Sequence, residues 1–115
     1  MAIDEALIRQ VTRTIVEHFH PRRIILFGSQ ARGDAGPDSD MDLFIEMDTP
    51  SRRKTATDIS MLFGLRDWAM DIIIYIPEEV ARYSGQAGSI LYIAETEGKV
   101  LYECLNYSPT VSRVA

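Results

Sequence analysis

The stretch that decides the fold is Gly28-Ser29-Gln30-Ala31-Arg32-Gly33, which is followed after four residues by Asp38-Ser39-Asp40-Met41-Asp42-Leu43. The first segment follows residues 22–27, an apolar run of strand length. Gly28 and Ser29 are therefore expected where a strand gives way to a loop or a short helix. A helix that begins there would direct free backbone N–H groups and the positive end of its dipole toward a bound anion. The pattern predicts a phosphate-binding turn.

Acidic residues alternate directly after this turn. Residues 42–47 read as a second strand, and the period of two in a strand puts Asp40 and Asp42 on one face. A third acid, Asp71, lies near the start of residues 70–76, the most β-rich segment. A charge in a buried strand is costly unless something positive compensates it. Three carboxylates supply the hard oxygen ligands that Mg²⁺ or Mn²⁺ prefers, so we expect these acids to form a divalent metal site.

The glycine-rich turn supplies groups that suit a phosphate. Gly28 lets the backbone approach an anion closely, Ser29 can donate from its hydroxyl and N–H, and Arg32 can add a charge-assisted contact. Ser29 could also cap a helix, a role compatible with phosphate binding. The spacing of Gly28 and Gly33 imitates a Walker A loop, but Asp34-Ala35 stands where Lys and Ser/Thr are needed. The combination favours a metal-dependent reaction on a nucleoside triphosphate.

The order Gly-Ser, ten residues, Asp-x-Asp and a later Asp flanked by apolar residues resembles the nucleotidyltransferase superfamily that includes DNA polymerase β and the aminoglycoside nucleotidyltransferases. The short chain, the glycine-rich turn and the segments 88–92 and 98–103 resemble more narrowly the minimal nucleotidyltransferases of prokaryotes. This resemblance covers about residues 22–103. It implies a polymerase β-like palm fold, with Asp40, Asp42 and Asp71 as catalytic metal ligands.

The resemblance also implies an activity and a partner. Two Mg²⁺ ions, with Mn²⁺ as a substitute, would support transfer of AMP from ATP to a hydroxyl by in-line displacement. Many minimal nucleotidyltransferases are paired with a small helical HEPN-domain protein, and some are antitoxins that adenylylate a tyrosine of that partner. We therefore expect a HEPN toxin as acceptor. The alternatives are an aminoglycoside-type transferase acting on a small molecule and a non-catalytic nucleotide-binding or antitoxin module.

The pattern of elements predicts an α/β (α+β) chain with a small mixed sheet of about four strands flanked by helices. Helical spacing of apolar residues begins at Ile3 and ends near His20-Pro21. Further helices are predicted over residues 51–68, from Pro77 onward and over 89–97, and strands over 22–27, 42–47, 70–76 and 99–103. We expect one minimal nucleotidyltransferase domain over residues 1–105 and an irregular tail over 106–115.

Composition limits the partners. The 115 residues carry a net charge of −5, which argues against general affinity for nucleic acid, because such binding depends on Lys and Arg. No apolar run is long enough to span a bilayer and the N-terminus lacks the features of a signal peptide, so a cytoplasmic location without membrane contact is expected. A homo- or hetero-oligomer is possible. Arg52-Arg53-Lys54 reads as a solvated helix face or as a triphosphate contact, and Arg22-Arg23 is equally ambiguous.

Overall fold

One mixed sheet forms the centre of the computed structural model, which describes residues 3–36 and 38–107. Its strands are β1 (Arg23–Phe27), β2 (Met41–Glu46), β3 (Met70–Tyr75) and β4 (Lys99–Glu103). They lie in the order β3-β2-β1-β4, so β3 and β4 form the two edges. β1 is antiparallel to both neighbours, whereas β2 and β3 are parallel. The predicted α+β fold with a four-stranded mixed sheet is confirmed.

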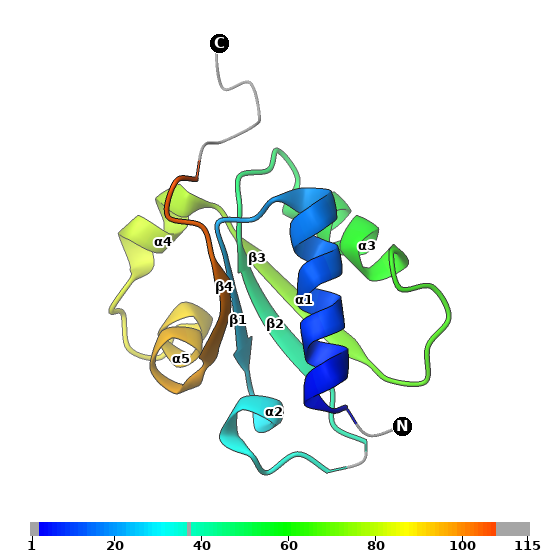
Figure 1. Ribbon diagram of the computed structural model, residues 1–115. Coiled ribbons are helices and arrows are strands. Elements are labelled where there is room, and N and C mark those ends of the chain that lie inside the picture. The colour runs from blue at the N-terminus through cyan, green and yellow to red at the C-terminus, as the bar shows by residue number, and fades with distance from the viewer. Residues whose placement is uncertain (1–2, 37, 108–115) are drawn as a thin grey trace.

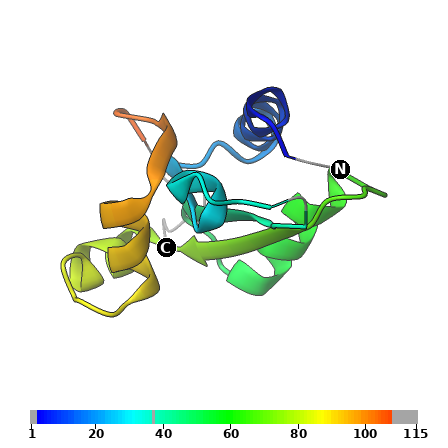
Figure 2. The same cartoon turned by 90° about the horizontal axis from the view of Figure 1, so that it is seen from below.

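Helices cover both faces of this sheet. α1 (Glu5–Phe19) and α3 (Arg52–Met61) pack on one face, and α4 (Pro77–Tyr83) and α5 (Ile90–Glu97) pack on the other (Figures 1 and 2). Strand alternation separates the two cores, since Ile24 and Leu26 of β1 face α1 whereas Ile25 and Phe27 face α5. The short helix α2 (Ser29–Arg32) follows β1 at the lower end of the sheet in Figure 1.

The predicted helix limits hold where a local signal marks them. Asp4 caps α1 by accepting a hydrogen bond from the N–H of Leu7 at 2.8 Å, and Ser89 caps α5 by accepting from the N–H of Tyr92 at 3.0 Å. α1 ends at His20, which adopts a left-handed conformation with φ of 50° immediately before Pro21. The end before Pro21 is the one that the sequence indicated, and the caps by Asp4 and Ser89 are added by the structure.

The helix predicted over residues 51–68 is wrong at its C-terminal end. α3 stops at Met61, and Gly64 adopts a positive φ of 54° that reverses the chain. The Arg66 guanidinium donates to the carbonyl oxygens of Ser60 (3.4 Å) and Gly64 (3.3 Å), so it satisfies acceptors that another helical turn would have used. Leu65, which lies within the predicted helix, is fully exposed.

Two further sequence predictions can be compared with the structure only over the residues that it describes. No helix within residues 3–36 and 38–107 is long and apolar enough to cross a membrane. Most of the predicted irregular tail, residues 108–115, lies outside the described residues. Its described beginning contacts the domain, because the Tyr107 hydroxyl accepts a hydrogen bond from the N–H of Asp48 at 2.7 Å. The domain boundary at residue 105 stays a prediction.

Gly98, at the C-terminal end of α5, provides a test of how this helix packs on β1. A Cβ at this position would overlap the carbonyl oxygen of Ala94 and approach that of Leu26 to 2.8 Å. Because backbone atoms cannot move aside cheaply, Gly98→Ala should lower the free energy of unfolding by about 1–3 kcal/mol in urea titrations. Gly36→Ala is the control, since nothing lies within 4 Å of a Cβ there. Equal stability of the two variants would contradict this packing.

Candidate active site

Strand pairing brings the predicted site residues to one end of the sheet. Asp42 in β2 lies directly opposite Asp71 in β3, and on its other side it lies opposite Phe27, the last residue of β1. The row across the sheet therefore reads Phe27, Asp42, Asp71, and Gly28, the residue after Phe27, lies against the side chain of Asp42. Both aspartates point to the face covered by α4 and α5, because the residues two positions further along, Phe44 and Ile73, pack there.

Position 28 requires a glycine for two reasons, the backbone conformation there and the nearby side chain of Asp42. Its φ of 74° and ψ of −154° belong to a region that side-chain-bearing residues avoid. A Cβ at this position would overlap the Oδ2 atom of Asp42. The sequence predicted close approach of the Gly28 backbone to a phosphate, and the structure adds close approach to a carboxylate. Only a residue without a side chain lets the turn after β1 pack this closely against the Asp42 carboxylate.

The turn after Gly28 closes as a short helix. The N–H groups of Ala31 and Arg32 both donate to the carbonyl oxygen of Gly28, at 3.1 and 3.0 Å. The capping position is occupied by Gly28 rather than by Ser29, so the capping role considered for Ser29 is wrong. As the first residue of α2, Ser29 has an N–H that lies ahead of the helical hydrogen bonds. Its hydroxyl and N–H are thus not needed to cap the turn.

Arg32 already has an anionic partner that the sequence analysis missed. Its Nε donates to Oδ2 of Asp34 at 3.3 Å, and both side chains are about half exposed or more. Exposed pairs of this kind contribute little stability, so a stronger anion can displace Asp34. The spacing of two residues within a glycine-flanked loop was the available signal for this pair.

The electrostatics of Asp42 show that the acids lie close together. Burial raises the pKa of its carboxyl above the ordinary value of 3.8, and the negative charges of Asp71 and Asp40 raise it further. The positive charge of Arg32 opposes these effects without cancelling them. The ionised form of Asp42 is therefore under strain that a cation would relieve.

Burial of the other two acids departs from the sequence argument. Asp71 was expected in a buried strand, but β3 is an edge strand and Asp71 is exposed, so desolvation does not demand a cation there. Asp40 is also exposed and precedes β2. Within the described residues, no three His, Cys, Asp or Glu side chains form a ready-made metal cage. The donor chemistry suits Mg²⁺, yet the carboxylates of Asp40 and Asp71 would have to turn toward a bound ion.

The ambiguous arginines at the other end of the sheet have structural partners. Glu46, with 2% of its surface exposed, accepts from Nη1 of Arg22 and Nε of Arg23, both at 3.1 Å. Arg23 also donates to Glu95 of α5 at 3.2 Å. These contacts tie α5 to β1 and β2, and they involve the start of β1, whereas the candidate site lies at its end.

The basic cluster at the start of α3 is likewise engaged away from the acids. Arg52 donates to Glu79 at 2.7 Å, and Lys54 donates to Asp58 at 2.9 Å. Burial by itself would raise the pKa of Glu79, but the hydrogen bonds from Arg52 and from the N–H of Ile76 outweigh burial and lower this pKa. Arg52 and Lys54 thus support the reading of this cluster as part of a helix face rather than a triphosphate contact.

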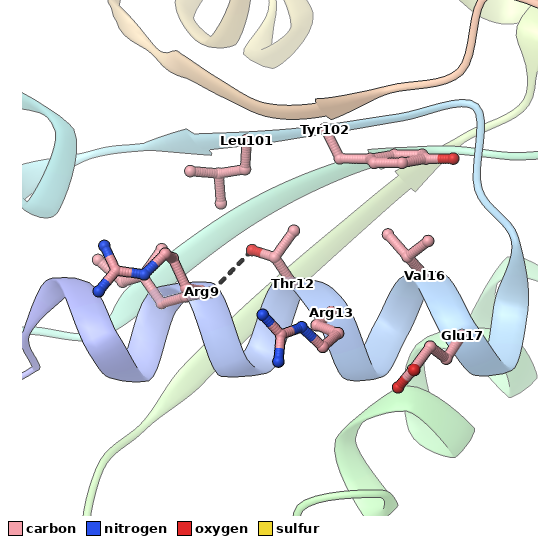
Figure 3. Close-up of a pocket in the computed structure, with 8 residues that line it drawn as sticks. Arg9, Thr12, Arg13, Val16, Glu17, Leu101 and Tyr102 are labelled. Carbon is pink, nitrogen blue, oxygen red and sulfur yellow. Dashed lines mark hydrogen bonds between the residues drawn. The ribbon is translucent and has the colours of Figure 1, made fainter.

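A surface groove lies away from the acids, where α1 stands off from β4 (Figure 3). It measures about 320 Å³, and Leu101 and Tyr102 of β4 point toward α1. An irregularity in the pairing of β1 with β4 between Ile24 and Ile25 explains why two consecutive residues point the same way. An adjoining hollow of about 490 Å³ reaches Gln30 of α2.

Comparison with known proteins agrees with this arrangement. The family model of the nucleotidyltransferase domain matches residues 8–108. A search of curated proteins gives no significant match. Among solved structures, a protein of Sulfolobus solfataricus that was provisionally assigned as a nucleotidyltransferase is similar in fold, with a TM-score of 0.55 and 16% identity. The match covers 92% of this chain and 86% of that one. The chain belongs to the nucleotidyltransferase domain family.

Proposed function

We propose that the chain is a metal-dependent nucleotidyltransferase that moves AMP from ATP to a hydroxyl, in particular a tyrosine hydroxyl of a HEPN-domain partner. The observation that supports it best is that Asp42 and Asp71 lie in one row at one end of the sheet, with Gly28 against Asp42. In this row the pKa of Asp42 is raised by burial and by the neighbouring acids. Family membership supports the transfer reaction, and the resemblance to minimal nucleotidyltransferases supports the donor and the partner.

The chain's own groups divide the work of binding the donor. Ser29 donates from its hydroxyl and N–H to phosphate oxygens. Arg32 exchanges the carboxylate of Asp34 for a phosphate and keeps a charge-assisted hydrogen bond. Two Mg²⁺ ions, or Mn²⁺ in their place, held by Asp40, Asp42 and Asp71 would neutralise the triphosphate and lower the pKa of the acceptor hydroxyl.

Transfer is an in-line displacement at the α-phosphorus of ATP. The acceptor oxygen forms a bond to this phosphorus, the bond to the bridging oxygen of the β-phosphate breaks, and pyrophosphate leaves. We assign to Asp71, which is exposed on the edge strand, the role of accepting the proton that the hydroxyl loses. The products are an AMP ester of the acceptor and pyrophosphate.

Binding of ATP should require a divalent ion. The triphosphate and the carboxylates of Asp40, Asp42 and Asp71 have the same sign of charge, so they repel one another until a cation lies between them. In calorimetric titrations, ATP should bind at least about tenfold more weakly in EDTA than in Mg²⁺, a difference of ~1.4 kcal/mol. Equal affinities in the two buffers would argue against the site.

Asp42→Asn should separate catalysis from stability. Removing this carboxylate should lower the transfer rate at least about 100-fold, because charge stabilisation at the reacting phosphate is lost. In EDTA at neutral pH its Tm should equal or exceed that of the wild type, because the ionised form of Asp42 is disfavoured by burial and by Asp71 and Asp40. Asp71→Asn should be equally inactive. A collapse of Tm in both variants would indicate a structural role for the acids.

The acceptor is tested by co-expression with the protein encoded by the adjacent gene. Intact mass spectrometry should show that this protein gains one or a few AMP units, and Asp42→Asn should abolish the gain. An unmodified partner, together with transfer of radioactive AMP to an aminoglycoside or to an RNA end, would keep nucleotidyl transfer but overturn the proposed acceptor.

A further inference from the structure

The guanidinium that the proposed function assigns to the triphosphate already binds a carboxylate of its own loop. Nε of Arg32 donates to Oδ2 of Asp34 at 3.3 Å. Within residues 3–36 and 38–107, Asp34 is the only side chain that hydrogen-bonds to Arg32, and the two Nη groups of Arg32 have no partner. A phosphate that binds this guanidinium would either displace Asp34 or share Arg32 with it.

The backbone keeps Asp34 next to Arg32. Arg32 is the last residue of α2, and Gly33 after it adopts a positive φ of 86° that reverses the chain. The N–H of Asp34 then donates to the carbonyl oxygen of Ser29 at 3.2 Å, as the N–H of Gly33 does at 3.0 Å. The turn thus fixes the Asp34 backbone against α2, with its carboxylate within reach of the guanidinium.

Solvent exposure makes this ion pair easy to exchange. The side chains of Arg32 and Asp34 are 48% and 63% exposed. An exposed pair of this kind changes an equilibrium constant by a factor of at most about five. The contact is therefore too weak to exclude a phosphate, but it is strong enough to lower the affinity for a phosphate measurably.

The same guanidinium acts on the acids of the candidate site. Burial raises the pKa of Asp42, as do the negative charges of the neighbouring acids, whereas the positive charge of Arg32 opposes these effects. Arg32 is therefore close enough to Asp42 for its charge to matter there. Replacement of Asp34 by a phosphate is thus an event at the donor site and not on a remote surface.

From these contacts we infer that Asp34 is a tethered competitor for phosphate, whose carboxylate binds Arg32 in the free protein and weakens the binding of ATP and of pyrophosphate there. The inference rests on the proposed function and adds a regulation of the donor site. The tether keeps the local concentration of the carboxylate high. When pyrophosphate leaves after transfer, Asp34 binds Arg32 again and so favours release of the product.

Both modes of phosphate binding lead to the same expectation. If the phosphate displaces Asp34, the ion pair with Arg32 is lost. If the phosphate binds the Nη groups while Asp34 stays on Nε, two anions lie on one guanidinium and repel each other. In either case, removal of the Asp34 charge should strengthen phosphate binding through Arg32.

Asp38 provides a matched control for the charge of Asp34. It is an exposed aspartate of the same loop, and it makes no hydrogen bond or ion pair with any residue that the structure describes. Asp34→Asn and Asp38→Asn each remove one negative charge, but only Asp34→Asn frees Arg32. Any general effect of loop charge on a phosphate ligand is therefore common to the two variants.

The experiment measures by calorimetry how the wild type and both variants bind ATP and pyrophosphate, each in Mg²⁺. Asp34→Asn should bind both ligands about two- to fivefold more tightly than Asp38→Asn. Pyrophosphate has no base or sugar, so an equal effect on it assigns the competition to the phosphates. The Tm of each variant should stay close to that of the wild type, because both side chains are exposed.

A double-mutant cycle tests whether Asp34 acts through Arg32. Arg32→Gln should weaken the binding of both ligands, because a charge-assisted contact is lost. In this background, Asp34→Asn should strengthen binding no more than Asp38→Asn does. The difference between the two backgrounds isolates the contact between the two side chains.

The outcomes distinguish this inference from the proposed function. Equal affinities of Asp34→Asn and Asp38→Asn would overturn the competitor role, and so would tightening that persists with Arg32→Gln. Weaker binding by Asp34→Asn would make its carboxylate part of the binding site and would also overturn that role. All three results would leave nucleotidyl transfer intact. A wild-type chain that binds neither ATP nor pyrophosphate in Mg²⁺ would overturn the proposed function itself.

Discussion

The pairing of β2 between an antiparallel and a parallel neighbour is the constraint on which the rest of the molecule depends. β1, the antiparallel partner, ends beside Asp42, so the turn that follows β1 places Gly28 and α2 next to this acid. The parallel partner begins at the same end, so Asp71 arrives at the same level. A sheet of only parallel or only antiparallel strands in this order would not bring both a strand end with its helix and a second acid to one place.

Glu46, a second acid on β2, is a carboxylate with a structural role. Glu46, on the same face of β2 as Asp42, is almost fully buried and is matched by two arginines. Asp42 is only partly buried, yet its nearest charged influences are mainly other acids, and Arg32 opposes them incompletely. Glu46 is thus compensated by positive charge and stabilises the fold, whereas Asp42 lacks such compensation at the end for which we propose a cation.

The sequence predicted most of the architecture because its signals were local. Proline after His20, the helical spacing of apolar residues before it, and the apolar runs of the strands each act within a few positions. The end of α3 was mispredicted because apolar residues continue at helical spacing past it, whereas Gly64 takes a positive φ and Arg66 donates to the carbonyl oxygens of Ser60 and Gly64, which no periodicity reveals. The exposure of Asp71 was missed for a similar reason, since hydrophobicity does not tell an edge strand from a central one.

The site composition was readable from the spacing of the acids, but its geometry was not. That a Cβ at Gly28 would meet Asp42 depends on the register of two strands, and that Arg32 contacts Asp34 depends on the closure of a turn. Both are tertiary facts that residue types leave open.

The register between β2 and β3 determines both the burial of the core residues of β3 and the position of Asp71 beside Asp42. Ile72 and Ile74 face the core under α1 and α3 in the same alignment that turns Asp71 toward the opposite face, beside Asp42. A slip of one residue would bring a carboxylate into that core and expose the isoleucines, because side chains alternate strictly along a strand. A misaligned chain would thus lose stability together with its acid pair, and cellular quality control that removes unstable chains would remove the inert ones with them.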